Sequence, residues 1–298
     1  MKKFGIDISR WQGEFNLTKA KKEGVEFVVI KGGGADDGLY VDRMFERNYK
    51  EAKAKKLPVG CYWFSKALST SDAKKEAEYL HKNILSGKQF ELPIYMDVEH
   101  KAMMALGKDK LTDIVIAFCE TLEKLGYFVG IYSSKVYFES KMHDHKLQAY
   151  AHWVAQWSRE CTYKGEENVL GMWQFGGETN VLRSNKVADV VCDQNYMYLD
   201  YPGLIKALGL NGYKKESTPS EEPAKEPQKE EPFFVAEGEL VSLSENATDL
   251  NTKKKFADWV YKTNLYVRKV DFRRIVVSTS MKGDVTGAVD ILNVKRPI

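Results

Sequence analysis

The sequence predicts an α/β fold, a closed eight-stranded barrel with an incomplete outer ring of helices, followed by a small α+β C-terminal domain. Three observations carry this prediction. Eight short, apolar, β-rich runs recur within the first two hundred or so residues. Helical patterns separate the early runs, and near-continuous apolar strands alternating with helices are typical of a parallel sheet buried on both faces. A proline- and glutamate-rich stretch then divides the chain, and eight strands before it indicate a barrel.

The elements of the barrel follow in chain order. The expected strands cover residues 4–8, 27–31, 58–64, 92–98, 127–133, 152–157, 169–175 and 190–198. The clearest amphipathic helices cover 41–56, 71–85 and 110–126. The gaps between the last three strands are too short or too rich in glycine for full helices, so the outer ring is expected to be incomplete there.

The chain divides at residues 214–232, which hold four prolines, six glutamates, four lysines and no large apolar residue. Such a segment cannot bury enough surface to offset its ordering entropy, and we interpret it as a linker. The predicted domains are therefore a barrel over 1–213 and a small domain over 233–298, with 11 basic and 8 acidic residues. In the small domain we expect a strand over 233–244, a helix over 251–264 and strands over 266–279 and 286–294.

Composition excludes several classes of protein. The 298 residues are 43% hydrophobic with a net charge of +3, which is too small an excess for a dedicated nucleic-acid binder. No run approaches the roughly 20 apolar residues that span a bilayer, so membrane insertion is not expected. The N-terminus lacks the apolar run of a signal peptide, which predicts synthesis in the cytoplasm. The four scattered cysteines lack the spacing of zinc sites and are expected to be reduced thiols.

The strongest catalytic pattern is Asp97-Val98-Glu99, at the end of the fourth expected strand. Side chains two residues apart on a strand share a face, so both carboxylates point toward the C-terminal end of the barrel, where such folds carry out chemistry. When two carboxyl groups are crowded together, their pKa values move apart, so that one stays protonated while the other is ionised. Glycoside cleavage needs such a pair. The alternative is a structural pair that caps a helix or forms a salt bridge.

Two further acids interrupt apolar strands. Asp7 lies in the first expected strand and Asp193 in the last. A barrel closes by pairing these two strands, so both side chains should be neighbours. An aspartate in a buried strand is costly unless it is paired or functional. Four acids at one rim indicate a catalytic site.

These segments together resemble a known family. GIDISRWQG at the start, LPIYMDVE in the middle, then WVAQW, MWQF and CDQN are similar to glycoside hydrolase family 25, the lysozymes (N-acetylmuramidases) common among bacteriophage endolysins. The resemblance spans about residues 1–205. It implies a (β/α)5β3 barrel that cleaves the β-1,4 bond after N-acetylmuramic acid in peptidoglycan. Glu99 then matches the general acid and Asp97 the carboxylate that orients or stabilises the reacting centre, while Asp7 and Asp193 match supporting acids.

The chain departs from the family pattern at two strands. After the second strand the family usually has Lys-Ala-Ser/Thr-Glu-Gly, whereas this chain has Lys31-Gly32-Gly33-Gly34-Ala35. The usual Tyr-His-Phe of the third strand is Tyr62-Trp63-Phe64. Neither change removes a matched acid, but both affect how sugar rings fit.

Aromatic residues at or near strand ends are candidate sugar contacts, because flat rings with a polar edge suit sugar faces. The candidates are Tyr62, Phe64, Tyr132, Trp153, Trp157 and Trp173, with Gln174 beside the last. Trp173 and Gln174 are the preferred sugar contact. The alternative is barrel core, to which about half of the aromatic residues are expected to belong.

Other chemistry is poorly supported by the sequence. The stretch GGGADDG lacks the ending and the spacing of a phosphate-binding loop. Asp97, Glu99 and His100 lack a third metal ligand at suitable spacing, and no serine follows the nucleophile-elbow pattern. A chitinase would carry a longer acidic motif in the fourth strand. We therefore expect no metal and no cofactor.

The sequence thus predicts a two-part peptidoglycan hydrolase of the endolysin type, made in the host cytoplasm and acting on the cell wall after release. Its small domain is expected to bind the wall, through an anionic polymer or peptidoglycan itself, or to mediate self-association. Basic and aromatic residues support this, among them Lys254, Lys255, Arg268, Trp259 and Tyr266. The alternatives left open are a solvated basic face in the small domain, and a barrel that binds wall glycan without cutting it.

Overall fold

The computed structural model describes residues 2–163, 170–214, 235–252, 254–271, 274–282, 284–295 and 297. The chain divides into two compact units, Met1–Pro219 and Ser220–Ile298, which we describe separately. Apart from Lys214, the predicted linker over 214–232 lies outside the described residues, so its character and the exact domain boundaries stay predictions.

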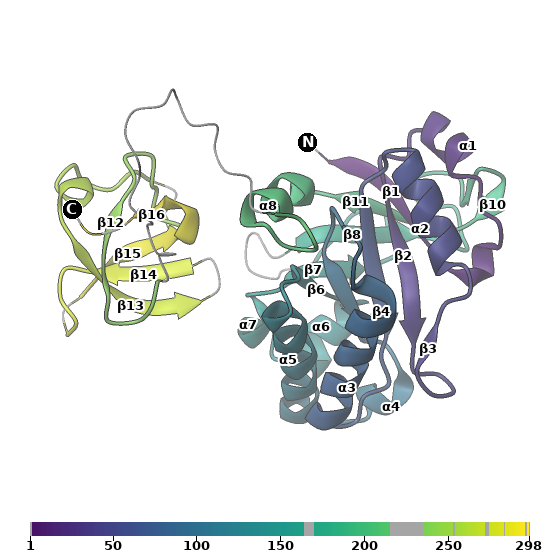
Figure 1. Ribbon diagram of the computed structural model, residues 1–298, viewed down its shortest axis with the longest axis horizontal. Helices are drawn as coiled ribbons and strands as arrows, with labels where there is room; N and C mark the ends of the chain where they lie inside the picture. Colours follow the sequence, from purple (N-terminus) through teal and green to yellow (C-terminus); the bar gives the residue numbers. More distant parts are fainter. Residues whose placement is uncertain are drawn as a thin grey trace. The chain divides into compact units, whose positions relative to one another are not determined.

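The first unit is a closed barrel of eight strands (Figure 1). Its strands, in their order around the ring, are β1 (Lys3–Ile8), β2 (Phe27–Gly34), β4 (Val59–Phe64), β5 (Ile94–Asp97), β6 (Val129–Ser134), β7 (Ala151–Ala155), β8 (Leu170–Gly176) and β11 (Asp193–Met197). Strand β1 closes the ring by pairing with β2 on one side and β11 on the other. A short strand, β3 (Tyr40–Val41), extends β2 at one end. The expected barrel is confirmed.

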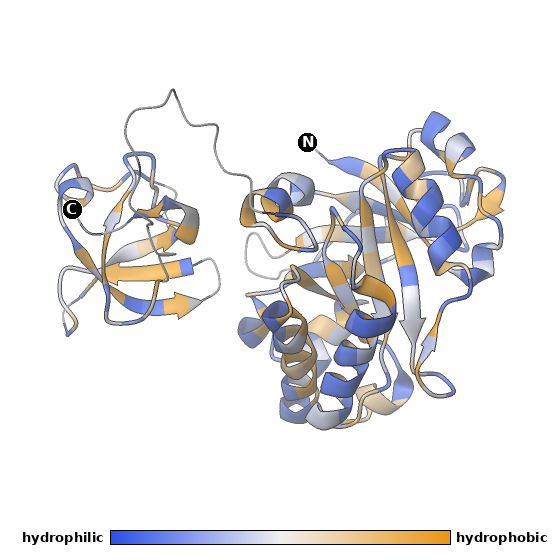
Figure 2. Cartoon of the chain, in the orientation of Figure 1, coloured by the Kyte–Doolittle hydropathy of each residue, from blue (hydrophilic) through white to orange (hydrophobic). Residues whose placement is uncertain are grey.

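Helices cover the outside of the barrel between the early strands. They are α1 (Leu17–Lys22), α2 (Phe45–Ala54), α3 (Thr70–Leu80), α4 (Lys101–Met104), α5 (Lys108–Lys124), α6 (Lys135–Lys141), α7 (Asp144–Leu147) and, after the last strand, α8 (Tyr201–Leu208). In α5 the apolar positions recur every three or four residues and are buried, as in Leu111, Val115, Phe118 and Leu122. Figure 2 shows hydrophobic residues concentrated on the strands and hydrophilic residues along α2 and α3. The expected helix over 71–85 ends earlier as α3 and continues as a π-helical turn, His81–Leu85.

The last strand of the barrel differs from the parallel sheet that the sequence pattern indicated. Strands β1 to β8 of the ring run parallel, but β11 pairs antiparallel with both β8 and β1. A parallel connection needs a crossover of a dozen or more residues, usually a helix. The link from β8 to β11 instead contains a hairpin of β9 (Lys186–Val187) and β10 (Val190–Val191). Its two turn residues, Ala188 and Asp189, have positive φ, as tight hairpin turns require.

The second unit is a five-stranded antiparallel sheet with its own apolar core. Its elements are β12 (Leu240–Leu243), a 3-10 turn (Val260–Lys262), β13 (Leu265–Asp271), β14 (Arg274–Ser278), β15 (Val285–Asp290), a second 3-10 turn (Ile291–Asn293) and β16 (Val294–Lys295). The last strand returns to pair with β12.

The expected helix over 251–264 is wrong for the described residues of that segment. Only the 3-10 turn at Val260–Lys262 is helical there. The Asp249 side chain accepts hydrogen bonds from the backbone N–H groups of Asn251 and Thr252 (both 2.8 Å), which holds a turn where a helix would begin. Short polar side chains compete with helix in this way, and the helical period of the sequence did not reveal it.

Among the described residues, no helix is both long enough and apolar enough to cross a membrane. None of the four cysteines forms a disulfide in the structure, and Cys61, Cys119 and Cys192 are buried, as expected for most of them.

Candidate active site

Four carboxylates lie at one end of the barrel because of where their strands begin and end. Asp97 is the last residue of β5, and Glu99 follows two residues later. Asp193 is the first residue of β11, and it pairs in register with Asp7 of β1. Since β11 runs antiparallel, its first residue lies at the end where the parallel strands finish. The expectation that Asp7 and Asp193 are neighbours is confirmed.

The strand order places the acids as two facing pairs. Three strands separate β5 from β11 in each direction around the ring, so the two strands lie on opposite sides of the barrel. Asp97 and Glu99 therefore belong to one wall of the mouth, and Asp7 and Asp193 to the other. The two walls interact electrostatically, because the charge of Glu99 raises the pKa of both Asp7 and Asp193.

All four carboxyl groups hold their protons more tightly than usual, and loss of hydration is the main cause in each case. Burial raises the pKa of Asp7 to about 6, although hydrogen bonds from Asn195 and Gln174 act in the opposite direction. Burial and the charge of Asp7 raise the pKa of Asp193 to about 8. The pKa of Asp97 lies well above its usual range because of burial and the charge of Glu99.

Glu99 differs from the other three in being exposed to solvent. Its surroundings at the mouth still reduce its hydration enough to raise its pKa. An accessible carboxylic acid that retains its proton is suited to general acid catalysis. Asp97 is only 3% exposed, and its Oδ1 atom is buried without a hydrogen-bond partner among the described residues.

Lys31 is a member of the site that the sequence interpretation missed. It lies in β2, is 7% exposed, and its Nζ atom is 4.7 Å from the ring centroid of Phe64 and 5.8 Å from that of Tyr62. Its charge lowers the pKa of Asp97 and Glu99 and so opposes their burial. A single lysine in the apolar run FVVIK could have indicated it, because a buried lysine needs acidic neighbours.

A hydrogen-bond network fixes the carboxylate of Asp7. Its Oδ2 accepts from Asn195 Nδ2 (2.8 Å) and Gln174 Nε2 (3.1 Å). Gln174 Oε1 in turn accepts from Tyr132 OH (3.0 Å) and Trp157 Nε1 (3.1 Å). Asn195, a second residue that was missed, points inward because it lies two positions from Asp193 on β11. The network links β1, β6, β8 and β11 across the mouth.

Comparison with known proteins decides the family. Residues 6–183 match the family model described as glycosyl hydrolases family 25. The chain belongs to this family. Among curated proteins it resembles lysozyme M1 of Streptomyces globisporus, with 33% identity over 105 residues that cover 34% of each protein. The chain thus matches about a third of that relative's length.

Solved structures show the same fold. A bacterial lysozyme from Streptomyces coelicolor has a TM-score of 0.57 at 24% identity, covering 70% of this chain and 97% of that one. The CTP1L endolysin has a TM-score of 0.57 at 21% identity, covering 69% and 70%. A muramidase from Trichobolus zukalii has a TM-score of 0.57 at 21% identity, covering 70% and 99%.

In this family 25 barrel, most of the expected aromatic contacts gather at the mouth. Tyr62, Phe64 and Tyr132 are half-buried, and Trp157 is 44% exposed. Trp153 lies beneath them, 1% exposed, with its ring centroid 4.4 Å from that of Tyr132 and its Nε1 donating to Asn195 Oδ1 (2.8 Å). It therefore supports the site from within the barrel.

Trp173 is placed differently from the expectation. It is 4% exposed, packs with Phe175 and Tyr196 in the apolar core, and donates from Nε1 to the carbonyl oxygen of Gln156 (2.8 Å). Because side chains alternate along β8, Gln174 faces the acids and Trp173 faces away from them. Of the preferred pair, only Gln174 lies with the acids.

The first unit has a hollow of about 440 Å³, and none of the four carboxylates lines it. That hollow is lined by Tyr49, His81, Lys88, Gln89 and Tyr127, which precede β5 and β6 or lie on the helices, and so it belongs to the opposite end of the barrel. Within the described part of the chain, no group of three or more His, Cys, Asp or Glu side chains is arranged to hold a metal ion.

Proposed function

We propose that this chain is an N-acetylmuramidase that hydrolyses the β-1,4 bond between N-acetylmuramic acid and N-acetylglucosamine in peptidoglycan. The observation that carries the proposal is the pair at the end of β5, an exposed Glu99 with a raised pKa near a buried Asp97, at the C-terminal end of the strands of a family 25 barrel. The resemblance to lysozyme M1 supports the substrate class.

Glu99 is the general acid in this proposal. It donates its proton to the glycosidic oxygen as the bond to the sugar C1 breaks, and positive charge develops at C1. Its exposure lets a polymeric substrate reach it, and its raised pKa keeps it protonated in the free enzyme to a higher pH than an ordinary glutamate. Water then completes hydrolysis at C1, and Glu99 is reprotonated from solvent.

Asp97 is the orienting and stabilising carboxylate. Its buried, unpartnered Oδ1 is an acceptor that the folded chain leaves open, and an unsatisfied buried acceptor favours a ligand that supplies a donor. The N–H of the 2-acetamido group is such a donor. Burial raises the pKa of Asp97 well above its usual range, and the nearby charge of Lys31 opposes that rise and so favours the ionised form as the acceptor of this hydrogen bond.

Asp7 and Asp193 are supporting acids on the facing wall. Asp7 holds the amides of Gln174 and Asn195, and through Gln174 it fixes the polar edges of Tyr132 and Trp157. We propose that the sugar rings lie against Tyr62, Phe64, Tyr132 and Trp157, with Gln174 as a polar contact and Trp153 as the support beneath.

The partner of the barrel is peptidoglycan, and we propose that the enzyme acts at the cell wall as an endolysin. The fold shared with the CTP1L endolysin supports this role. The small domain is proposed to hold the enzyme on the wall, through an anionic polymer or peptidoglycan itself, or to mediate self-association. Lys254, Lys255 and Lys262 of that unit, with the half-exposed Trp259, support a surface for an anionic partner.

The experiment is lysis of purified cell walls by wild type and by Glu99→Gln. We expect turnover to fall at least about 100-fold, since general acid catalysis commonly contributes 10²–10⁴. Glu78→Gln makes the same chemical change at an exposed position on α3 and should keep full activity. Mass spectrometry should find N-acetylmuramic acid at the new reducing ends. Glycan binding without any new reducing ends would favour the non-catalytic alternative.

A further inference from the structure

We infer that Trp11 forms a distal subsite that stacks on a sugar ring of the glycan strand, away from the bond that is cleaved. This inference rests on the proposed function, because it concerns the same substrate. It extends the binding surface beyond the four acids to a rim that is built from three neighbouring segments of the barrel mouth.

Trp11 is 77% exposed, more than any other large apolar side chain among the described residues. It lies three residues after the end of β1, the strand that carries Asp7. The turn that presents it is rigid, since Ser9 Oγ accepts from the N–H of Trp11 (3.3 Å) and Gln12 Oε1 accepts from the N–H of Ser9 (2.9 Å). A large ring held in water on this turn offers a flat apolar face with a polar edge, which suits a sugar ring.

Arg10 joins this turn to the hairpin that follows β2. Its guanidinium carbon lies 5.1 Å from the ring centroid of Trp11 and 5.1 Å from that of Tyr40 on β3. Its backbone N–H donates to Asp42 Oδ2 (3.1 Å). The turn after β1 and the hairpin after β2 therefore form one structure.

The glycine run after Lys31 explains how the hairpin fits. Strand β3 pairs antiparallel with Gly33 and Gly34. A Cβ atom at Gly33 would overlap the carbonyl oxygen of Tyr40, and one at Gly34 would lie 2.9 Å from the carbonyl oxygen of Phe64 and 3.2 Å from Tyr40 OH. The departure from the family's usual pattern therefore makes room for β3 at the rim of the mouth.

The loop after β4 completes the rim. Lys66 Nζ donates to the carbonyl oxygen of Asp36 (2.9 Å), and Tyr40 OH donates to Asp36 Oδ2 (3.0 Å). Strands β1, β2 and β4 are parallel neighbours, so all three segments leave the barrel at the end where Asp97 and Glu99 lie. Three further apolar side chains are exposed on these segments: Leu39, Val41 and Leu68.

The chemistry of the rim favours an uncharged sugar ring over an acidic stem peptide. The guanidinium of Arg10 lies over the ring of Trp11, and its charge already interacts with Asp36 and Asp42. A bound carboxylate would have to compete with both. The exposed face of Trp11 offers apolar area to the C–H face of a pyranose, as aromatic rings do for half-wet ligands. A glycan strand that is cleaved at an internal bond must extend beyond the mouth of the barrel, and this rim is continuous with the mouth.

The test compares long soluble glycan strands with the shortest oligosaccharide that the wild type cleaves. For Trp11→Ala, we expect the ratio of kcat/KM on long strands to kcat/KM on the short substrate to fall about tenfold, through KM. Trp11→Phe should restore most of the ratio, because it retains an aromatic face. Leu125→Ala, an apolar truncation at the opposite end of the barrel, should leave it unchanged.

An unchanged ratio for Trp11→Ala would overturn the distal subsite and leave the proposed hydrolase intact. A loss seen only on peptide-bearing glycan, and not on strands stripped of peptides, would overturn the sugar assignment in favour of the stem peptide. Calorimetric binding of uncleaved long strands to Glu99→Gln, with and without Trp11→Ala, tests the subsite separately from catalysis. Equal affinities there would also refute it, whereas an inactive wild type would refute only the hydrolase.

Discussion

Asp7→Asn is expected to stabilise the barrel at neutral pH while impairing the site. Asp7 is 5% exposed, and its pKa rises from the ordinary 3.8 to about 6 in the folded chain. The folded state therefore binds this proton more tightly than the unfolded chain, and stability is lost as pH rises from about 4 through about 6. At neutral pH the ionised Asp7 side chain therefore lowers the free energy of unfolding.

The magnitude follows from the pKa difference. Each pKa unit corresponds to about 1.4 kcal/mol, so a rise from 3.8 to about 6 costs about 3 kcal/mol of folding free energy once the group is fully ionised. Asparagine does not titrate, and its amide oxygen can still accept from Gln174 and Asn195. Between about pH 4.5 and pH 7.5, the stability of the variant relative to wild type should rise by about 2 kcal/mol. Removing the Asp7 charge also relieves Asp193, whose pKa it raises, and this acts in the same direction.

The assay is denaturant unfolding of both proteins at these two pH values, followed by the fluorescence of the barrel tryptophans. Asp113→Asn makes the same chemical change on the exposed side of α5 and should show no pH-dependent difference from wild type. A relative stability of Asp7→Asn that is the same at both pH values would refute the argument that burial of this carboxylate costs folding free energy.

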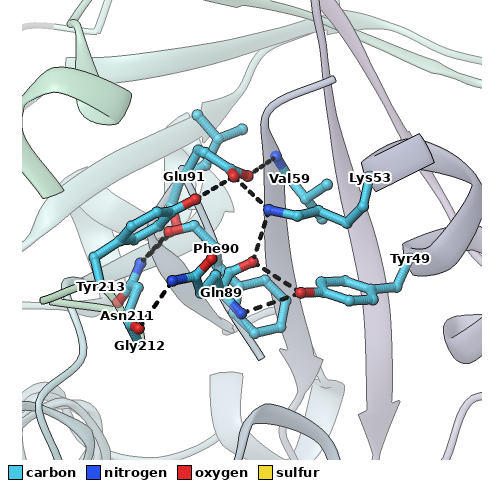
Figure 3. Close-up of polar contacts among 10 residues, drawn as sticks. Tyr49, Lys53, Val59, Gln89, Phe90, Glu91, Asn211, Gly212 and Tyr213 are labelled. Atoms are coloured by element: carbon cyan, nitrogen blue, oxygen red, sulfur yellow. Dashed lines mark hydrogen bonds and ion pairs between the residues drawn. The ribbon is translucent and has the colours of Figure 1, made fainter. Parts of the chain in front are cut away.

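Three further predictions concern other parts of the molecule. Asn211→Ala should cost at least about 3 kcal/mol in unfolding experiments, because it removes the three hydrogen bonds that this buried side chain makes with backbone groups of Phe90, Leu92 and Phe128 (Figure 3 shows the surrounding contacts). A chain ending after Tyr213, whose hydroxyl donates to Glu91, should keep a cooperative thermal transition, whereas one ending at Gly209 should lose stability. Residues 233–298 fused to a fluorescent protein should label walls that the full enzyme lyses, less so at high salt; no labelling would favour self-association instead.

The acids that we propose as catalytic could be selected from the sequence. Asp97 and Glu99 had to share a face at a strand end, and Asp7 interrupts an apolar strand where an acid is costly. Strand and helix periods likewise predicted the barrel, since local hydrophobic patterns determine which face of each element is buried.

The tertiary structure alone decided which groups meet across the mouth. Lys31 and Asn195 join the acids because β2 and β11 close the same ring, and their partners are distant in sequence. Side chains alternate along β8, so when Gln174 points toward the acids, its neighbour Trp173 must point into the apolar core. The sequence does not reveal which of the two neighbours faces the acids. The expected helix over 251–264 gave way to a loop held by Asp249. The hydrophobic period of a sequence shows which face of one helix or strand is buried. Strand register, closure of the barrel and side-chain hydrogen bonds depend on contacts between elements, and these contacts determine which residues meet at the candidate site.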